Sequence, residues 1–345
     1  MPAIQYGLSS FERARGDLPA LPVINLFAEE APTEEKGVVL QSRAPLVERG
    51  VSMGTGPVDA LFQRDNVLGD SLFGVADGTL YREAEALGPV NGSGPFSIAG
   101  YENFLFAAGG GGLWGWNGTA LQSIAFPDGA SVAAVTVGGG RLIAIRKDTG
   151  KFYWSAPLAS AIDALDFATA ENQPDRLRDL LFIDDVLVLF GAETVEFWPN
   201  TTSSDLPFQP LEGRVFEKGI KATGCATVFD ATFCWVGNDN VVYTNGQVPV
   251  RLSNAGLEEQ IAASSTARLF RFEMEGCEFL ALRIEAGTWV YSSRSRMWSE
   301  FQSHGELNWI PQCYAAGVFG SSIDGRTARF GSGHADFGGV LERRF

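Results

Sequence analysis

The stretch that decides the fold covers residues 137–216. It begins with VGGGRLIAIR (137–146) and KFYWS (151–155), continues with DALDFATAENQPDR (163–176), and ends with LLFIDDVLVLFGAETVEFWPN (180–200). The run 182–190 is apolar enough to be buried on both faces, residues 191–194 suit a hairpin loop, and residues 195–198 alternate as a half-buried strand does. These patterns predict one four-stranded sheet with an irregular acidic crossover between its halves. The rest of the chain reads as variations on this unit.

The composition indicates a folded protein made mostly of strands. With 345 residues, the chain can form one large all-β domain or two smaller ones. A hydrophobic content of 45% excludes a disordered chain. The 41 glycines and 25 phenylalanines favour many tight turns between short aromatic strands. Only residues 254–263 are expected to form a helix, capped by Ser253 or Asn254, with one more helical turn at residues 156–164.

Hairpin signals recur along the chain from residue 51 onward. SLFGVADGTLY (71–81) turns at Asp77-Gly78, and LWGWNGTALQSIAF (113–126) turns at Asn117-Gly118. Asp-Gly and Asn-Gly between alternating runs are the strongest short hairpin signals. The sheet units recur at about 40 to 50 residues, a period typical of propeller blades. Six or seven such units fit, which predicts an all-β, β-propeller-like fold. A pair of β-sandwiches and an irregular β-solenoid are the alternatives.

Two domains are expected, an extended N-terminal arm over residues 1–50 and a β-propeller-like hub domain over residues 51–345. The arm contains the extended segment LPALPVINLF (18–27), which is interrupted by prolines, then a charged loop, and then a strand that begins at residue 38. An arm of this kind either closes the sheet system or reaches a neighbouring subunit.

The net charge of -15 keeps a protein in solution and repels nucleic acid at long range. The charge therefore excludes a protein that binds DNA tightly, but it does not exclude one past which DNA slides.

The N-terminal MPAIQYG lacks the basic start and apolar core of a signal peptide. No apolar run approaches the roughly 20 residues of a membrane helix. The sequence therefore predicts a soluble protein made in a cytoplasm.

Signals for metal, cofactor or catalytic chemistry are sparse. Cys225, Cys234, Cys277 and Cys313 show no CxxC spacing, and a Cys225–Cys234 disulfide across a hairpin lacks support from an oxidising compartment. His304 and His334 lie outside any HExxH pattern and are expected in loops. No nucleophile elbow or phosphate loop is present. No cofactor, metal or catalytic residue is predicted.

The enzyme alternative is a β-propeller glycoside hydrolase or a carbohydrate-binding protein. Glycoside hydrolysis needs two carboxylates across a cleft, and Asp184-Asp185 or Glu171 with Asp175 are the candidate pairs. A turn explains Asp184-Asp185 better, because Asp favours turns between apolar runs. Trp154, Trp198 and Trp298 close strands, a position more typical of packing at a blade edge than of a sugar platform.

Several segments resemble the packaged-DNA stabilisation family, the tail-hub or nozzle proteins of short-tailed phages. The resemblance is carried by LPALPVINLF (18–27) through LVERG (46–50), FATAENQPD (167–175), FGAETVEFW (190–198) and VFEKGI (215–220). It extends from about residue 15 to the end of the chain. Members of the family run on past the segment matching LERRF (341–345) into a further β region. We therefore expect either that this region is absent here or that the chain is a fragment.

The resemblance implies a structural virion protein. Such proteins assemble as a ring of six copies below the portal-adaptor ring, extend the channel through which double-stranded DNA leaves, and help to retain the packaged genome. The expected partners are further copies of the chain, the portal-adaptor ring, and tail fibre, spike or needle proteins. The expected location is the virion tail, assembled in the host cytoplasm. Two hypotheses follow: the arm straps the contact between subunits, and Asp163, Asp166, Glu171 and Asp175 face the channel or that contact.

Overall fold

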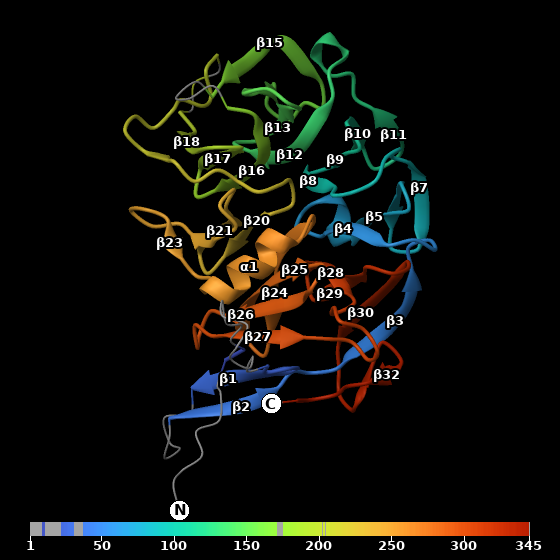
Figure 1. Cartoon of the computed structure of the whole chain (residues 1–345). Coiled ribbons are helices and arrows are strands. Elements are labelled where there is room, and N and C mark those ends of the chain that lie inside the picture. Colours follow the sequence, from blue (N-terminus) through green and yellow to red (C-terminus); the bar gives the residue numbers. More distant parts are fainter. Residues whose placement is uncertain are drawn as a thin grey trace, which may run out of the picture.

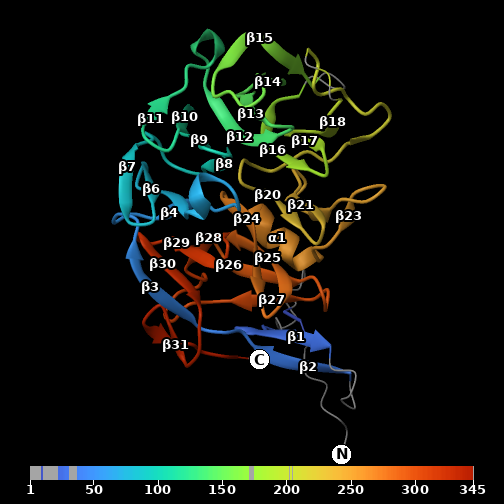
Figure 2. The ribbon, with the colours of Figure 1, turned by 180° about the vertical axis from the view of Figure 1, so that it is seen from behind.

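The chain folds into a β-propeller of seven blades, each a four-stranded sheet (Figure 1). The computed structural model describes residues 9–10, 22–30, 37–170, 175–201, 203 and 205–344. Neighbouring strands within every blade are antiparallel. The blades follow one another in chain order around the ring, as the colour sequence in Figures 1 and 2 shows. The predicted β-propeller is therefore confirmed, and the blade number is the upper of the two that were expected.

Six blades are built from consecutive strands, and the seventh combines three C-terminal strands with one from the N-terminal region. The first strands of adjacent blades lie against one another and form the inner wall of the ring. The first blade contains β4 (Val58–Phe62), β5 (Phe73–Ala76), β6 (Thr79–Arg82) and β7 (Glu85–Pro89); the second contains β8 (Ser97–Tyr101), β9 (Phe104–Gly109), β10 (Gly112–Trp116) and β11 (Leu121–Ser123); the third contains β12 (Val132–Gly138), β13 (Arg141–Arg146), β14 (Lys151–Ser155) and β15 (Ile162–Thr169). The fourth contains β16 (Leu177–Ile183), β17 (Val186–Gly191), β18 (Val195–Pro199) and β19 (Val215–Phe216); the fifth contains β20 (Ala226–Phe229), β21 (Thr232–Val236), β22 (Val242–Thr244) and β23 (Val250–Arg251). The sixth contains β24 (Ala267–Met274), β25 (Cys277–Ile284), β26 (Gly287–Ser292) and β27 (Trp298–Phe301); the seventh contains β28 (Pro311–Ala315), β29 (Val318–Ser321), β30 (Arg326–Phe330) and β3 (Leu46–Ser52).

The propeller is closed by strand β3, which comes from the beginning of the chain. β3 pairs with β30 from Leu46↔Phe330 to Ser52↔Arg326 and supplies the outer strand of the seventh blade. The next strand, β4, is the inner strand of the first blade. One continuous segment thus joins the last blade to the first, so the ring cannot open without breaking this ladder. β3 also crosses the expected domain boundary at residue 50.

The prediction that residues 137–216 form one sheet was wrong. They belong to two neighbouring blades, β12–β15 and β16–β19. The first half of the segment expected to be an irregular crossover belongs to strand β15, which pairs with β14 through Lys151↔Thr169 and Tyr153↔Phe167. An outer strand has a neighbour on only one side, so its sequence does not need clean alternation. The helical turn expected at residues 156–164 was also wrong, because residues 162–164 already belong to β15.

The predicted hairpin turn at Asp77-Gly78 and the predicted helix at residues 254–263 were confirmed. Asp77 and Gly78 both have positive φ angles, 50° and 64°, as the tight hairpin turn between β5 and β6 requires. The helix α1 (Ala255–Ala263) begins after Asn254, whose side chain accepts the Leu257 N–H at 3.0 Å. This contact satisfies one of the amide groups left without a partner at a helix start. Two short 3₁₀ turns are present: η1 (Leu68–Asp70) lies between β4 and β5 within the first blade, and η2 (Pro127–Gly129) lies between the second blade and the third.

Aromatic side chains fill the spaces between the blades. Phe272 on β24 is completely buried, and its ring lies within 6.5 Å of seven other rings from the sixth and seventh blades and the segment between them. Trp154, Trp198 and Trp298 are at most 5% exposed, which confirms that they pack in the core. Within the described part of the chain, no helix is both long and apolar enough to cross a membrane.

Candidate functional site

The described part of the N-terminal arm lies against its own propeller. Strands β1 (Leu26–Glu30) and β2 (Val38–Ser42) form an antiparallel hairpin beside β27 and the C-terminus (Figure 2). The Asn25 N–H donates to the Glu300 carbonyl at 2.7 Å, and the Ile24 N–H donates to the Arg344 carbonyl at 2.8 Å. The arm backbone is thus held between the outer strand of the sixth blade and the last residues of the chain.

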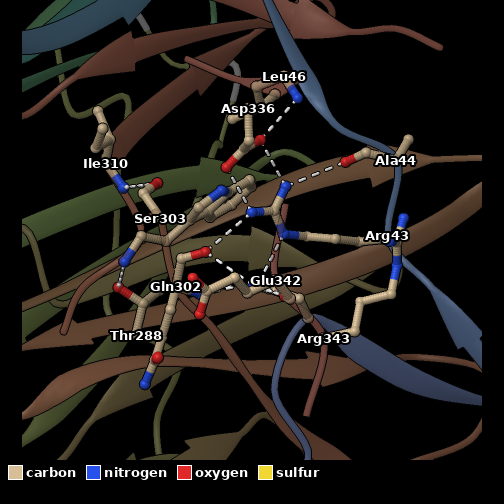
Figure 3. A network of polar contacts seen from close by, with 12 residues as sticks. Arg43, Ala44, Leu46, Thr288, Gln302, Ser303, Ile310, Asp336, Glu342 and Arg343 are labelled. Carbon is tan, nitrogen blue, oxygen red and sulfur yellow. Dashed lines mark hydrogen bonds and ion pairs between the residues drawn. The ribbon is translucent and has the colours of Figure 1, made fainter. Parts of the chain in front are cut away.

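A buried ion pair fixes the arm to the C-terminal segment (Figure 3). The Arg43 guanidinium donates to both carboxylate oxygens of Asp336, at 2.8 and 2.7 Å. It also donates to the side-chain oxygen of Asn25 at 2.8 Å and to the Gln302 carbonyl at 3.1 Å. Asp336 accepts the Leu46 N–H at 2.8 Å, so the pair also fixes the start of β3. We call Asn25, Arg43, Gln302 and Asp336 the clasp.

The charged side chains of the clasp are almost completely buried from solvent. The side chains of Arg43 and Asp336 are 0% and 1% exposed. The guanidinium also lies 5.4 Å from the ring centre of Phe301 and 5.3 Å from that of Trp309. Two buried charges recover their desolvation cost only when their hydrogen-bonding groups are well satisfied, and this geometry meets that condition. Asp336 also ends the small strand β31 (Ala335–Asp336), which pairs with β32 (Gly339–Val340).

Sequence reasoning did not single out the clasp. Arg43 and Asp336 are 293 residues apart, and neither lies in a recognisable motif. The one local signal is that both flank short strand patterns close to the ends of the chain. Their pairing follows from the closure of the ring, which brings the two ends together.

The inner strands of all seven blades line a central cavity of about 290 Å³. Asp179 on β16 is a buried carboxyl in this wall. It accepts the Gly224 N–H at 2.8 Å and the Leu180 N–H at 2.9 Å. The bond to Gly224 connects the fourth blade to the segment that leads into the fifth. Burial raises the pKa of Asp179 to about 7, although the two N–H donors act in the opposite direction.

Asp179 is therefore expected to make stability depend on pH. Its pKa is higher in the folded chain than the ordinary value of 3.8, so the folded state binds the proton more tightly. Stability from this group is fully present below about pH 4 and is lost as the pH rises to about 7. As the pH rises from 5 to 7, we expect the free energy of unfolding of Asp179→Asn to increase by roughly 2 kcal/mol relative to that of the parent protein. Urea unfolding of both proteins across this range measures the difference, and parallel pH profiles would contradict the assignment.

The predicted acidic set is divided by the structure. Asp175 is buried, and one of its carboxylate oxygens accepts the N–H groups of Glu193 and Thr194 at 2.9 and 2.8 Å. It therefore stabilises the β17–β18 turn, and its expected position facing a channel or a subunit contact was wrong. Asp163 is exposed and Asp166 is half-buried on β15, the outer strand of the third blade. Glu171 lies outside the described residues.

Asp184 and Asp185, the candidate catalytic pair that the structure describes in full, do not face each other across a cleft. Asp184 and Asp185 occupy the β16–β17 turn, are exposed, and have φ angles of 49° and 62°. Asp185 accepts the side-chain amide of Asn200 at 3.2 Å. The interpretation of Asp184-Asp185 as a turn is therefore confirmed. Asp175, the other carboxylate proposed for hydrolysis, is engaged by the backbone donors of the next hairpin.

Histidines and cysteines lie apart from one another. His304 and His334 are exposed in loops, as expected, and His304 Nδ1 lies 3.1 Å from Glu342 Oε1. All four cysteines are free thiols, so the Cys225–Cys234 disulfide is not formed. Burial raises the pKa of the Cys225, Cys234 and Cys313 thiols to about 12. Within the described residues, no three His, Cys, Asp or Glu side chains are grouped as metal ligands would be.

Solved structures of other proteins have a similar fold. Raptor of Chaetomium thermophilum matches with a TM-score of 0.53 and 9% identity, over 84% of this chain and 30% of that protein. The computationally designed protein Ika8 matches with a TM-score of 0.51 and 14% identity, over 83% of this chain and 99% of that protein. At these identities the likeness supports the fold alone.

Sequence comparison identifies a closer relationship. The tail hub protein gp10 of Salmonella phage P22 is 23% identical over 223 residues, which cover 60% of this chain and 46% of that protein. The chain thus spans about half the length of this curated relative. The family model described as Bacteriophage P22 Gp10, beta-propeller, matches residues 28–315. Because this match covers well over half of the chain, the protein belongs to the Bacteriophage P22 Gp10 β-propeller family.

Proposed function

We propose that this chain is a structural tail protein that forms the hub, or nozzle, ring of a short-tailed phage. Six copies would surround the channel below the portal-adaptor ring and help to hold the packaged genome until ejection. The observation that carries the proposal is membership of the P22 Gp10 family over residues 28–315. A structural role in a phage tail follows from the family itself, whereas the ring, its partners and its channel are our proposals.

The charge of the chain supports passage of DNA without binding. A net charge of -15 repels a polyanion, so DNA meets little attraction on most of the surface. Asp163 and Asp166 lie on the outer strand of the third blade, where an assembled ring could turn them toward the lumen or a neighbouring subunit. A ring structure with these two carboxylates on the outer wall would contradict this orientation.

The closed propeller supports a mechanical role. Strand β3 joins the last blade to the first, and the clasp holds Arg43 of the arm and Asp336 of the C-terminal segment against the sixth and seventh blades. A subunit built in this way presents a stiff body to its neighbours. A ring of identical subunits with head-to-tail contacts closes only when each rotation is fixed, which favours stiff subunits.

The arm strap can be tested without disturbing the clasp. Deleting residues 1–45 would remove Arg43 and would therefore destabilise the subunit itself. Deleting residues 1–21 retains β1, β2 and Arg43, but it also removes Ser9 and Ser10, which donate to the Trp298 and Val23 carbonyls. The matched control is therefore Ser10→Ala in the full chain. If the strap crosses the subunit contact, the deletion reduces the fraction of rings more than Ser10→Ala does, at a comparable melting temperature.

Native mass spectrometry and negative-stain microscopy test the hub itself. We expect particles with six-fold symmetry and a mass of six 37.1 kDa chains, alone or after addition of the portal-adaptor ring of the same phage. Antibodies to the chain should label the tail of intact virions. A chain that stays monomeric with the adaptor present, and antibodies that do not label virions, would overturn the proposal.

A further inference from the structure

Two arginines stand directly opposite each other at one mouth of the propeller channel. Arg268 lies on β24 and Arg283 on β25, and they are direct cross-strand partners in the sixth blade. Side chains in such positions start about 5 Å apart, and like charges there are destabilising. An arrangement of this kind needs either a neighbouring anion in the protein or an anion from outside.

The described residues do not supply an ion-pair partner to either guanidinium. Arg268 donates to the Asp59 main-chain carbonyl, and Arg283 donates to the Trp309 main-chain carbonyl. Neither arginine is among the ion pairs found between described residues. A guanidinium has five N–H donors, so one carbonyl leaves most of them for other acceptors.

Both arginines line a pocket of about 510 Å³ at this mouth. Polar side chains from neighbouring loops, Thr223, Ser265 and Thr266, complete its wall. Arg268 also lines the central cavity, so it marks the point where the pocket meets the channel. Burial, together with the charge of Arg268, lowers the pKa of Arg283 to about 10. The two positive charges thus act on each other in a partly dry site.

The acidic groups around the pocket limit what can bind. The Asp59 carboxylate lies in the field of Arg268, and burial raises its pKa above the ordinary value. Glu285 accepts the hydroxyl of Ser265, and Glu306 lies in the field of Arg283. These carboxylates repel a polyanion such as DNA. The pocket of about 510 Å³ that both arginines line is large enough for one compact oxyanion.

We propose that Arg268 and Arg283 form a binding site for a single oxyanion, a carboxylate or a phosphate, at this mouth of the channel. Planar guanidinium groups bind such oxygens with paired, charge-assisted hydrogen bonds. The oxyanion comes either from solution or from an acidic side chain or chain terminus of a protein partner. The site lies within one subunit, so its test does not depend on assembly of a ring.

Thermal unfolding in matched ionic strength tests the site. Sodium phosphate and sodium acetate are titrated against sodium chloride, with an oligo-glutamate peptide as the probe for a protein-borne carboxylate. We expect phosphate or acetate to raise the melting temperature of the parent protein more than chloride does. If the peptide binds more tightly than acetate, the oxyanion belongs to a protein partner. If the peptide binds as tightly as acetate or more weakly, the oxyanion is a free anion from solution.

Variants separate this site from general salt effects. Arg268→Gln and Arg283→Gln should each weaken oxyanion binding at least tenfold, which corresponds to about 1.4 kcal/mol. Arg329→Gln changes an exposed arginine on β30 and should bind like the parent. Should either pocket variant fail to fold, a crystal structure of the parent grown in phosphate is decisive, with the anion expected between the guanidinium groups. An empty pocket in that crystal, or a phosphate effect no larger than that of chloride, would overturn the proposal.

Discussion

Replacing Arg43 with methionine is expected to lower the free energy of unfolding by about 3–5 kcal/mol. The substitution keeps much of the side-chain volume but leaves the carboxylate of Asp336 buried without its partner. It also removes the donors to Asn25 and Gln302, which hold the arm to the last blades. Urea unfolding followed by tryptophan fluorescence measures the loss, because Trp309 packs against the guanidinium.

The double variant Arg43→Met with Asp336→Leu distinguishes a buried charge from a lost contact. Removing both partners removes the uncompensated charge, so the double variant should regain much of the stability lost in Arg43→Met. Arg294→Met is a matched control, because Arg294 is half exposed and lies 3.9 Å from Glu29. Exposed pairs of this kind contribute at most about 1 kcal/mol. An equal loss in the control and in Arg43→Met would contradict the clasp as a stabilising element.

Replacing Phe272 with alanine is expected to lower the free energy of unfolding by about 3–5 kcal/mol. The ring is fully buried and stacks on Phe279, with ring centres 5.2 Å apart. It also meets Trp309 at 5.3 Å and Phe319 at 5.6 Å, and so joins the sixth blade to the seventh. The cavity left by the ring cannot close without moving two sheets. Calorimetry or chemical unfolding of the variant measures this loss.

Two further substitutions show whether the loss comes from the position of Phe272 between the blades. Phe272→Leu retains an apolar side chain and should cost less than the alanine variant, because less of the cavity stays empty. Leu165→Ala removes a side chain that is 85% exposed on β15, and should change stability by no more than about 0.5 kcal/mol. A loss for Phe272→Ala no larger than that for Leu165→Ala would show that the blades do not depend on this contact.

The hairpins could be predicted from the sequence because their signals are local. Asp77 and Gly78 lie next to each other in the chain, and only a few residue types adopt the left-handed angles that their turn needs. The same reasoning identified Asp184-Asp185 as a turn and Asn254 as one of two candidate helix caps. The recurrence of such hairpins indicated blades, and the quoted segments were sufficient to indicate the family.

The boundaries between blades were harder to predict. Residues 163–169 carry acidic and apolar side chains without strict alternation, which is typical of an irregular segment and also of an outer strand. Only the pairing of β15 with β14 distinguishes the two. For the same reason, Asp175 looked like part of an acidic surface, whereas the fold buries it beneath the β17–β18 turn.

The sequence alone determined most of the strands and their turns, the acidic charge and the family, because each depends on neighbouring residues or on composition. The tertiary structure decided that β3 closes the ring, that Arg43 meets Asp336, and that Arg268 and Arg283 face one pocket. Alternation along a strand states which side chains share a face, but not which strand or blade they will meet. Contacts between residues 293 positions apart arise only when all seven blades are in place.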